Sequence, residues 1–529
     1  MRVRRDDLML LPVDVREWLP VDHLVWFVLD AVEAIDTSAL HRRAKLGRAG
    51  RSPYDPDMLL ALLIYSYTGG LSSSRKIERR CREDAAFMVL SGLCYPDHAT
   101  IARFRKHHDA AMEELFDQVL GLCGRLGMGA LQHVAIDGTK IEADASKSQS
   151  RDAGGLRKTA RRLLDEAAKV DEEEDALFGD AQGDELPEQL RDPARRRETI
   201  DEALKQAAAD KDRARGKARA RKVDKAQRAL ALLDELETDA DAKAETGLER
   251  PKARLARSEG MLARLRAETQ ARNDDRARRE AEAAAVGRTL PGTRPVAVDG
   301  QAHIVKAVAQ VERDRTALAV RQAAVVEVTG KRNLTDPDSR FMPVRGGGYI
   351  LGYNSQLAVS ADYLILAFDV VPDPGDDHQL VPMLDKLEQS VDLLRKAKNN
   401  PDLTVGTALF DAGYASTANL QAPGPDRLIA LGKRNNITGD DPPTVPPDEQ
   451  ASPRQHMAWR LSTPDGKALY KKRGATVEPV NSHLKDQRGL RRFSRRGNPA
   501  VKAELAFASL TTNLLRLFTT RPNSLHEAR

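Results

Sequence analysis

Two aspartates stand directly after short apolar segments that read as β-strands. Residues 131–136 (LQHVAI) lead into Asp137, and residues 405–410 (VGTALF) lead into Asp411. Open α/β sheets bring functional groups together at the carboxyl ends of their strands. Two carboxylates placed there repel each other unless a cation lies between them. The pattern therefore indicates a site for two divalent ions ~3.5–4 Å apart, which stabilise the attacking and leaving oxygens of an in-line displacement at phosphorus.

A third acid is expected in the most basic stretch of the chain. Residues 467–502 hold eleven Lys or Arg against two acids, Glu478 and Asp486, for a local charge of +9. An acid in a purely phosphate-binding helix would repel the DNA backbone, whereas a metal ligand there is chemically reasonable. On composition alone, an acid that only forms helix salt bridges remains the better explanation. The basic side chains able to neutralise phosphates are Lys471, Lys472, Arg473, Lys485, Arg488, Arg491 and Arg492.

Several long blocks of the chain resemble bacterial insertion-sequence transposases of the DDE type, and they occur in the right order. The resemblance covers most of the chain outside residues 150–330. Its blocks are residues 54–108, residues 135–146 (AIDGTKIEADAS), residues 333–356 (NLTDPDSRFMPVRGGGYILGYNSQ), residues 409–416 (LFDAGYAS) and residues 470–493 (YKKRGATVEPVNSHLKDQRGLRRF).

The last block resembles the C-terminal signature of these transposases. In that signature, a tyrosine and an arginine precede the catalytic glutamate, and a lysine follows it by seven positions; here they are Tyr470, Arg473, Glu478 and Lys485. Arg473 lies five residues before Glu478, where the commoner spacing is four. Pro479 is awkward inside a helix, so we expect a helix to begin there with Glu478 near its first turn.

The resemblance implies an α/β ribonuclease-H-like core, a mixed sheet flanked by helices. It places the first acid on the first strand, the second after the fourth strand and the third on a following helix, with Mg²⁺ or Mn²⁺, two ions, as cofactor. It further implies hydrolysis at the terminal inverted repeats, transfer of the freed 3′-hydroxyl into target DNA, and a homodimer that pairs two DNA ends. Tyr470, Arg473 and Lys485 would hold the DNA end near the cut.

The first 125 residues read as an all-α domain. Asp55-Pro56-Asp57 predicts a helix start, because an N-cap acceptor, a first-turn proline and an acid near the dipole all favour one. Short helices with a tight connection suggest a helix-turn-helix-like DNA-binding domain. A helical bundle with a solvated basic face is nearly as good an interpretation. The basic residues expected to contact DNA are Arg75, Lys76, Arg103 and Arg105.

The catalytic domain is expected to combine residues 126–150 with residues 331–520, followed by a tail over 521–529. Residues 151–330 are rich in Ala and charged residues and nearly lack aromatics. Leu248, Leu255 and Leu262 recur every seven residues, which predicts an inserted helical, coiled-coil-like arm and favours an antiparallel hairpin. A disordered linker and a solvated helix without a partner are the alternatives.

Other features narrow the function. No apolar run approaches ~20 residues, so we expect no membrane span and a cytoplasmic, nucleoid-associated protein. Arg345-Gly-Gly-Gly348 lacks the Lys-Ser/Thr of a P-loop, so no ATP use is expected. Competing ligands are available at Asp336, Asp338, Asp369, Asp373, Asp376 and Asp377; of these, Asp376-Asp377 reads first as a helix cap. A non-catalytic DNA-binding protein, such as a decayed transposase acting as a repressor, is the alternative function, and a coiled-coil assembly protein is a third.

Overall fold

The computed structural model describes residues 14–42, 53–178, 195–285, 287–289, 291, 296–323, 330–344, 346–432, 445–448, 450–522 and 525. Arg345 of the expected glycine loop lies outside this range. The chain forms two compact units, one that ends at Gln149 and resumes at Thr335, and one from Ser150 to Leu334. Among the described residues, no helix is long and apolar enough to cross a membrane.

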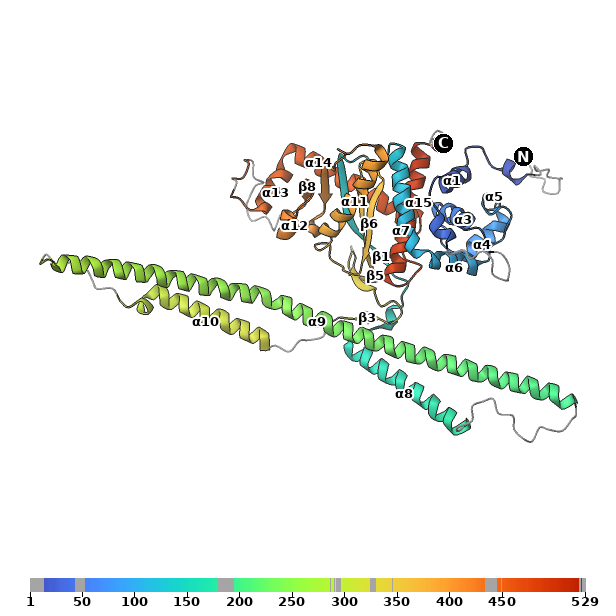
Figure 1. Cartoon of the computed structure of the whole chain (residues 1–529), viewed down its shortest axis with the longest axis horizontal. Helices are drawn as coiled ribbons and strands as arrows, with labels where there is room; N and C mark the ends of the chain where they lie inside the picture. The colour runs from blue at the N-terminus through green and yellow to red at the C-terminus, as the bar shows by residue number, and fades with distance from the viewer. Residues whose placement is uncertain are drawn as a thin grey trace. The chain divides into compact units, whose positions relative to one another are not determined.

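A mixed sheet forms the centre of the first unit (Figure 1). Its order is β4-β5-β1-β7-β8, and β6 also pairs with β5. β5 runs antiparallel to β1, β4 and β6, whereas β7 runs parallel to β1 and β8 parallel to β7. The strands are β1 (His133–Glu142), β4 (Arg340–Pro343), β5 (Tyr349–Ser360), β6 (Ile365–Val371), β7 (Thr407–Phe410) and β8 (Arg427–Ile429).

Strands β5 and β6 form a hairpin that turns at Ala361-Asp362. The Asp362 carboxylate fixes this turn, because it accepts hydrogen bonds from the backbone N–H groups of Gly129 and Ala130 at 2.9 Å each. The turn is thus tied to the segment that enters β1. Helices α7 (Asp109–Arg125), α11 (Leu380–Lys398) and α15 (Asn498–Thr520) contribute buried apolar side chains to the core beside this hairpin.

The N-terminal helices share one apolar core with the sheet. Asp55 caps α3 by accepting from the N–H of Asp57, so the predicted helix start is confirmed. The Tyr67 ring of α3 packs edge-on against Phe507 of α15, with 4.8 Å between centroids. These helices are α1 (Leu24–Glu33), α2 (Ser38–His41), α3 (Pro56–Thr68), α4 (Ser74–Glu83), α5 (Ala85–Ser91) and α6 (His98–His107).

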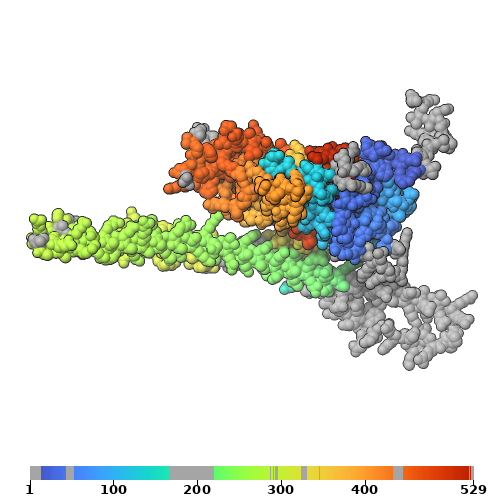
Figure 2. Space-filling view, turned by 45° about the horizontal axis from the view of Figure 1, so that its top comes forward, coloured from blue at the N-terminus to red at the C-terminus, as the bar shows by residue number. Residues whose placement is uncertain are grey.

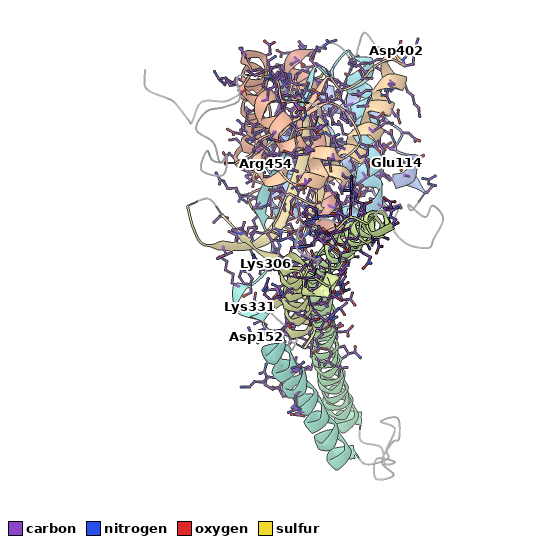
Figure 3. All side chains as sticks on the ribbon, turned by 90° about the vertical axis from the view of Figure 1, so that its left-hand side faces the viewer. Glu114, Asp152, Lys306, Lys331, Asp402 and Arg454 are labelled. Atoms are coloured by element: carbon purple, nitrogen blue, oxygen red, sulfur yellow. The ribbon has the colours of Figure 1, made fainter. Side chains whose placement is uncertain are left out.

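The second unit is a helical arm. Its helices are α8 (Ala153–Phe178), α9 (Arg195–Ala285) and α10 (Ala302–Ala323), and α8 and α10 each lie along α9 (Figure 1). Figure 2 shows the described part of α9 in green. Helix α10 runs antiparallel to α9, because Arg321 contacts Gly247 while His303 contacts Thr269. Its side chains, such as that of Lys306, are drawn in Figure 3. The predicted antiparallel helical arm is confirmed for the described residues.

The heptad leucines of the arm face a partner within the same chain. Leu248, Leu255 and Leu262 are half-buried on the stretch of α9 that packs against α10. Arg254 of α9 and Asp314 of α10 form an ion pair at 2.8 Å beside this seam. Near the base of the arm, Leu156, Leu232 and Leu236 join a second apolar cluster between α8 and α9.

A buried amide ties the last long helix to the sheet and gives a stability prediction. Asn513 of α15 accepts from the N–H of Ile365 at 2.9 Å and donates to its carbonyl at 2.8 Å. Replacing Asn513 by Ala strands both buried backbone groups. We expect Asn513→Ala to lower the free energy of unfolding by about 2–4 kcal/mol. Urea denaturation followed by tryptophan fluorescence measures this, because all three tryptophans lie outside the arm.

Ser509→Ala is the matched control on the same helix. The Ser509 hydroxyl is fully buried and has no hydrogen-bond partner in the described part of the chain. Its removal should change the stability by less than about 1 kcal/mol. Equal losses in the two variants would show that the Asn513 amide is not the tie we assign to it.

Candidate active site

Asp137 and Asp411 lie beside each other at the point where β7 ends. The last residue pair between β1 and β7 is Ile136 with Phe410, and the two aspartates are the next residues along each strand. Neighbouring strands are about 4.8 Å apart, so the two side chains start from adjacent positions. The sequence was right that Asp411 follows its strand. The strand predicted to end at Asp137 does not end there, because β1 continues to Glu142 through its pairing with β5.

The next turn of the chain fixes Asp411. Its carboxylate accepts a hydrogen bond from the N–H of Gly413 at 2.8 Å and caps the short helix Ala412–Tyr414. One carboxylate oxygen of Asp411 is thus held toward the loop, while its backbone position stays fixed by β7.

Asp137 is in a setting that disfavours its charge. Its side chain is only 18% exposed. Burial raises the pKa of Asp137 to about 6, and the negative charges of Asp411 and Asp376 add to this shift, while Arg473 opposes it. The three aspartates therefore form a concentration of negative charge, which Arg473 offsets only in part at Asp137.

Arg473 belongs to α14 (Pro464–Ser482), a helix that packs against β1. Its guanidinium Nη1 lies 3.4 Å from Asp137 Oδ2, and Nη2 lies 3.9 Å from Glu478 Oε1. At 3.4 Å the first contact is an ion pair rather than a well-formed hydrogen bond. One positive group thus lies between the first and third predicted acids.

Glu478 differs from the two aspartates because its side chain is largely exposed to solvent. Its side chain is 63% exposed and runs back along its own helix, where its Oε1 would lie 3.2 Å from a Cβ added at Gly474. The carboxylate oxygens of Asp137, Asp411 and Glu478 do not all lie within 4.8 Å of one another, as a closed ligand set would. Arg473 thus lies between Asp137 and Glu478, but the three carboxylates do not form a closed set of metal ligands.

The predicted helix start at Pro479 is wrong. Helix α14 begins at Pro464 with Thr463 as its N-cap, and Pro479 lies inside it. An internal proline costs a helix about 3 kcal/mol. Here Thr476, Val477 and Val480 are buried on the same turn, so their packing offsets that cost. A π-helical turn over His483–Gln487 follows directly.

Tyr470 and Lys485 lie on either side of Glu478 along the chain and both approach the aspartates. Tyr470 is half-buried; burial raises the pKa of its phenol, Arg473 lowers it and Asp411 raises it further. Lys485 Nζ donates to Thr139 Oγ1 at 2.5 Å. Thr139 is two residues beyond Asp137 on β1, so it points to the same face of the sheet. Burial is the main reason that the pKa of Lys485 is lowered.

The other basic residues of the C-terminal stretch separate into two kinds. Lys472, Arg491 and Arg492 are exposed, and the two arginines pair with Asp486 and Asp144. Arg488 is only 6% exposed and bonds to His483 Nε2 at 2.9 Å. Its predicted contact with DNA phosphates is therefore not supported, because burial in the core keeps its guanidinium from solvent.

The N-terminal basic residues separate in the same way. Arg75, Lys76 and Arg103 are exposed. Arg105 instead donates to Tyr67 Oη at 3.1 Å, to the Ser72 carbonyl at 2.8 Å and to Ser74 Oγ at 2.5 Å. These bonds join α6 to the start of α4 and give half-buried Arg105 a structural role.

Asp376 is a residue that sequence reasoning named as a competing ligand but ranked first as a helix cap. It was interpreted as a helix cap, but α11 is capped by Gln379 without a side-chain bond. The Asp376 carboxylate instead accepts hydrogen bonds from the side-chain amides of Asn354 and Gln356. Two polar residues at alternate positions of an otherwise buried strand were the available signal, since both amides must find a partner.

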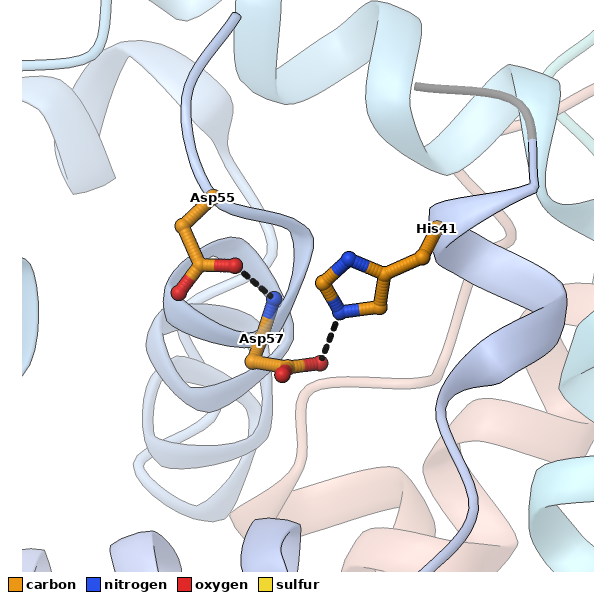
Figure 4. A group of neighbouring side chains, drawn as sticks. All are labelled: His41, Asp55 and Asp57. Atoms are coloured by element: carbon orange, nitrogen blue, oxygen red, sulfur yellow. Dashed lines mark hydrogen bonds and ion pairs between the residues drawn. The ribbon is translucent and has the colours of Figure 1, made fainter. Parts of the chain in front are cut away.

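A second group of ligand-type side chains occurs among the N-terminal helices (Figure 4). One atom each of His41, Asp55 and Asp57 lies within 4.8 Å of the others. His41 Nε2 is 3.0 Å from Asp57 Oδ1, and Asp55 caps α3. A helix cap and a surface ion pair account for these contacts. In the described part of the chain, no other group of three such residues is this close.

Comparison with known families decides the identity. A transposase domain (DUF772) matches residues 13–107, and a transposase DDE domain matches residues 444–518. The function that both matched domains support is that of a DNA transposase. No curated protein and no solved structure matched. The second domain contains Tyr470, Arg473, Glu478 and Lys485, so the segment that packs against β1 belongs to the transposase homology.

The raised pKa of Asp137 predicts how the stability of the metal-free transposase depends on pH. The folded protein holds the Asp137 proton up to pH about 6, whereas a model aspartate loses it near 3.8. This proton therefore contributes stability that is fully present below pH 3.8 and is lost as the pH rises to about 6. At pH 8, Asp137→Asn should stabilise the metal-free protein by about 2–3 kcal/mol more than at pH 4.

Urea denaturation at the two pH values in the presence of a chelator measures this difference. Asp402→Asn is the control, because Asp402 is an exposed aspartate in the turn after α11 (Figure 3). Its effect should be the same at both pH values. A pH-independent effect of Asp137→Asn would contradict the crowding of negative charge around Asp137.

Proposed function

We propose that this transposase hydrolyses phosphodiester bonds at the ends of its element and then joins the freed 3′-hydroxyl to target DNA, with Asp137, Asp411 and Glu478 as the catalytic acids. The observation that carries the proposal is the adjacency of Asp137 and Asp411 after the last β1–β7 pair, with Arg473 between Asp137 and Glu478. Alternatives based on a single nucleophilic side chain do not explain paired aspartates.

The sheet supports a ribonuclease-H-like core. Strands β1, β5 and β6 form an antiparallel meander, and β7 and β8 follow in parallel to β1 on its other side. The first acid then belongs to the first strand, the second follows β7, and the third lies on α14. We propose residues 126–150 and 331–520 as the catalytic domain, with the arm inserted between β1 and β5, and residues 1–125 as the domain that binds the terminal inverted repeats.

The residues present fit Mg²⁺ or Mn²⁺. These ions take oxygen ligands, and Mg²⁺ is commonly held by one or two carboxylates together with substrate phosphates. Asp137 and Asp411 offer such oxygens from fixed positions, and Glu478 would complete the set. A bound pair of ions would supply an activated water and neutralise charge on the phosphate.

Arg473 has two roles in this proposal. In the metal-free protein it offsets part of the charge of Asp137. With DNA bound, the guanidinium turns toward the phosphate next to the cut, where a bidentate contact is favourable. The exposed Glu478 side chain is then able to rotate toward the aspartates. Tyr470 and Lys485 would position the DNA end from the two flanks.

DNA phosphates would be neutralised by the exposed basic residues. Contacts by such residues dominate affinity and do not specify sequence. We propose this role for Lys472, Arg491 and Arg492 in the C-terminal stretch and for Arg75, Lys76 and Arg103 in the N-terminal helices. Pairing of two DNA ends calls for a homodimer on DNA.

A cleavage assay tests the proposal. The substrate is duplex DNA carrying the element's end, incubated with the full chain and Mg²⁺ or Mn²⁺. Asp137→Asn, Asp411→Asn and Glu478→Gln should each reduce cleavage by at least about 10³-fold, since each removes a carboxylate that would hold the metal ions. DNA binding, measured by gel shift, should stay within about threefold of the parent.

Asp465→Asn is the control, because Asp465 is an exposed acid in the first turn of the same helix as Glu478. Its cleavage should match the parent. If the parent chain bound the DNA but did not cut it with either ion, a non-catalytic DNA-binding protein would replace the proposed enzyme. If Glu478→Gln retained full cleavage, the third acid would have to be another residue.

A further inference from the structure

A fourth acid lies against the loops that carry Asp137 and Asp411. Asp376 stands in the connection between β6 and α11, and its side chain is 18% exposed. A Cβ added at Gly138 would lie 2.4 Å from its Oδ1, and one added at Gly413 would lie 3.2 Å from its Oδ2. The carboxylate thus fills the space that these two glycines leave open beside the two aspartates.

The carboxylates of Asp376 and Asp411 both lie against Gly413, although the oxygens of Asp137, Asp376 and Asp411 do not all come within 4.8 Å of one another. A Cβ position at Gly413 is 3.0 Å from Asp411 Oδ1 and 3.2 Å from Asp376 Oδ2. Asp376 Oδ1 likewise lies against Gly138, the residue that follows Asp137. Asp376 therefore belongs to the same acidic group as Asp137 and Asp411.

One oxygen of Asp376 is anchored firmly. Its Oδ1 accepts from Asn354 Nδ2 and from Gln356 Nε2, at 2.7 Å each, and lies 3.5 Å from Lys140 Nζ. Both amides are fully buried on β5. Gln356 is itself held, because its Oε1 accepts a hydrogen bond from the Tyr414 hydroxyl. A chain of buried polar groups from three segments thus sets the position of this carboxylate.

The second oxygen is not used in this way. Within the described part of the chain, every hydrogen bond and ion pair of the Asp376 carboxylate goes to Oδ1, and Oδ2 receives none. Partners that fix one side of a carboxylate commonly orient the other side as a metal ligand. A carboxylate needed only to satisfy two amides gains nothing from lying next to two further acids, because like charges repel.

We infer that Asp376 is an additional ligand of the proposed metal site and contributes Oδ2 next to Asp137 and Asp411. This inference rests on the proposed function, because it uses the same ions. With Asp376 included, the metal-free site has three aspartates in fixed positions before the exposed Glu478 joins them. Ion binding therefore does not depend on Glu478 alone.

Mn²⁺ binding by the full chain without DNA tests the inference independently of activity. Calorimetric titration and the loss of the free-Mn²⁺ electron paramagnetic resonance signal both measure the affinity. Asp376→Asn keeps an acceptor for the two amides and removes the charge, so Mn²⁺ should bind at least about tenfold more weakly. Asp377→Asn is the control, because the adjacent Asp377 is 50% exposed and contacts His378 instead. Its affinity should stay within about twofold of the parent.

Two outcomes separate this inference from the proposed function. If Asp137→Asn weakens Mn²⁺ binding and Asp376→Asn does not, the inference is overturned and the proposed site stands. If neither changes the affinity, both are overturned. Should Asp376→Asn fail to fold, Asp376→Glu retains the charge and displaces the oxygens by one methylene; weakened Mn²⁺ binding by this variant supports the ligand role, and parent-like binding overturns it.

Discussion

Mutual repulsion of carboxylates at the end of β7 is the constraint on which the rest of the site depends. Asp137 and Asp411 are fixed by strand register, and Asp376 is fixed by two buried amides. None of them can move away without breaking hydrogen bonds of the core. The compensating charges come from long side chains, Arg473 and Lys140, which can change rotamer at low cost. Carboxylates in fixed positions, paired with basic side chains that can move away, are the arrangement expected where a metal ion takes the place of a basic side chain.

Helix α14 links this site to the basic surface that follows it. Buried Val477 and Val480 hold the helix on the sheet despite Pro479, and this packing directs Arg473 toward Asp137 while Glu478 remains at the surface. The π-helical turn after it returns Lys485 to Thr139 on β1. Helix α14 and the turn after it therefore present Arg473 to Asp137, Glu478 to solvent and Lys485 to the face of β1 that carries Asp137. Exposed Lys472, which we propose to bind phosphate, lies on the same helix as Arg473 and Glu478.

Much of this could be predicted from the sequence, and the failures have physical reasons. Strands, the hairpin at Ala361-Asp362 and the helical arm follow from local patterns of apolar residues. The hydrogen bonds of Arg105 and the burial of Arg488 were not predictable, because partners such as Ser72 and Ser74 meet Arg105 only once the helices are packed. Asp376 was ranked first as a helix cap for the same reason: its position depends on Asn354 and Gln356, which reach it through β5 pairing and not through spacing along the chain. The helix start predicted at Pro479 was wrong because rules based on local sequence do not include the packing of the turn around this proline.

The most direct measurement is a crystal structure of the full chain soaked with Mn²⁺, in which anomalous scattering locates the ion. We expect a peak within about 2.0–2.6 Å of carboxylate oxygens from Asp137 and Asp411, with the Arg473 guanidinium displaced from its present contact. A peak only at His41, Asp55 and Asp57, or a soaked crystal in which Arg473 still pairs with Asp137 and no ion lies near either aspartate, would contradict it.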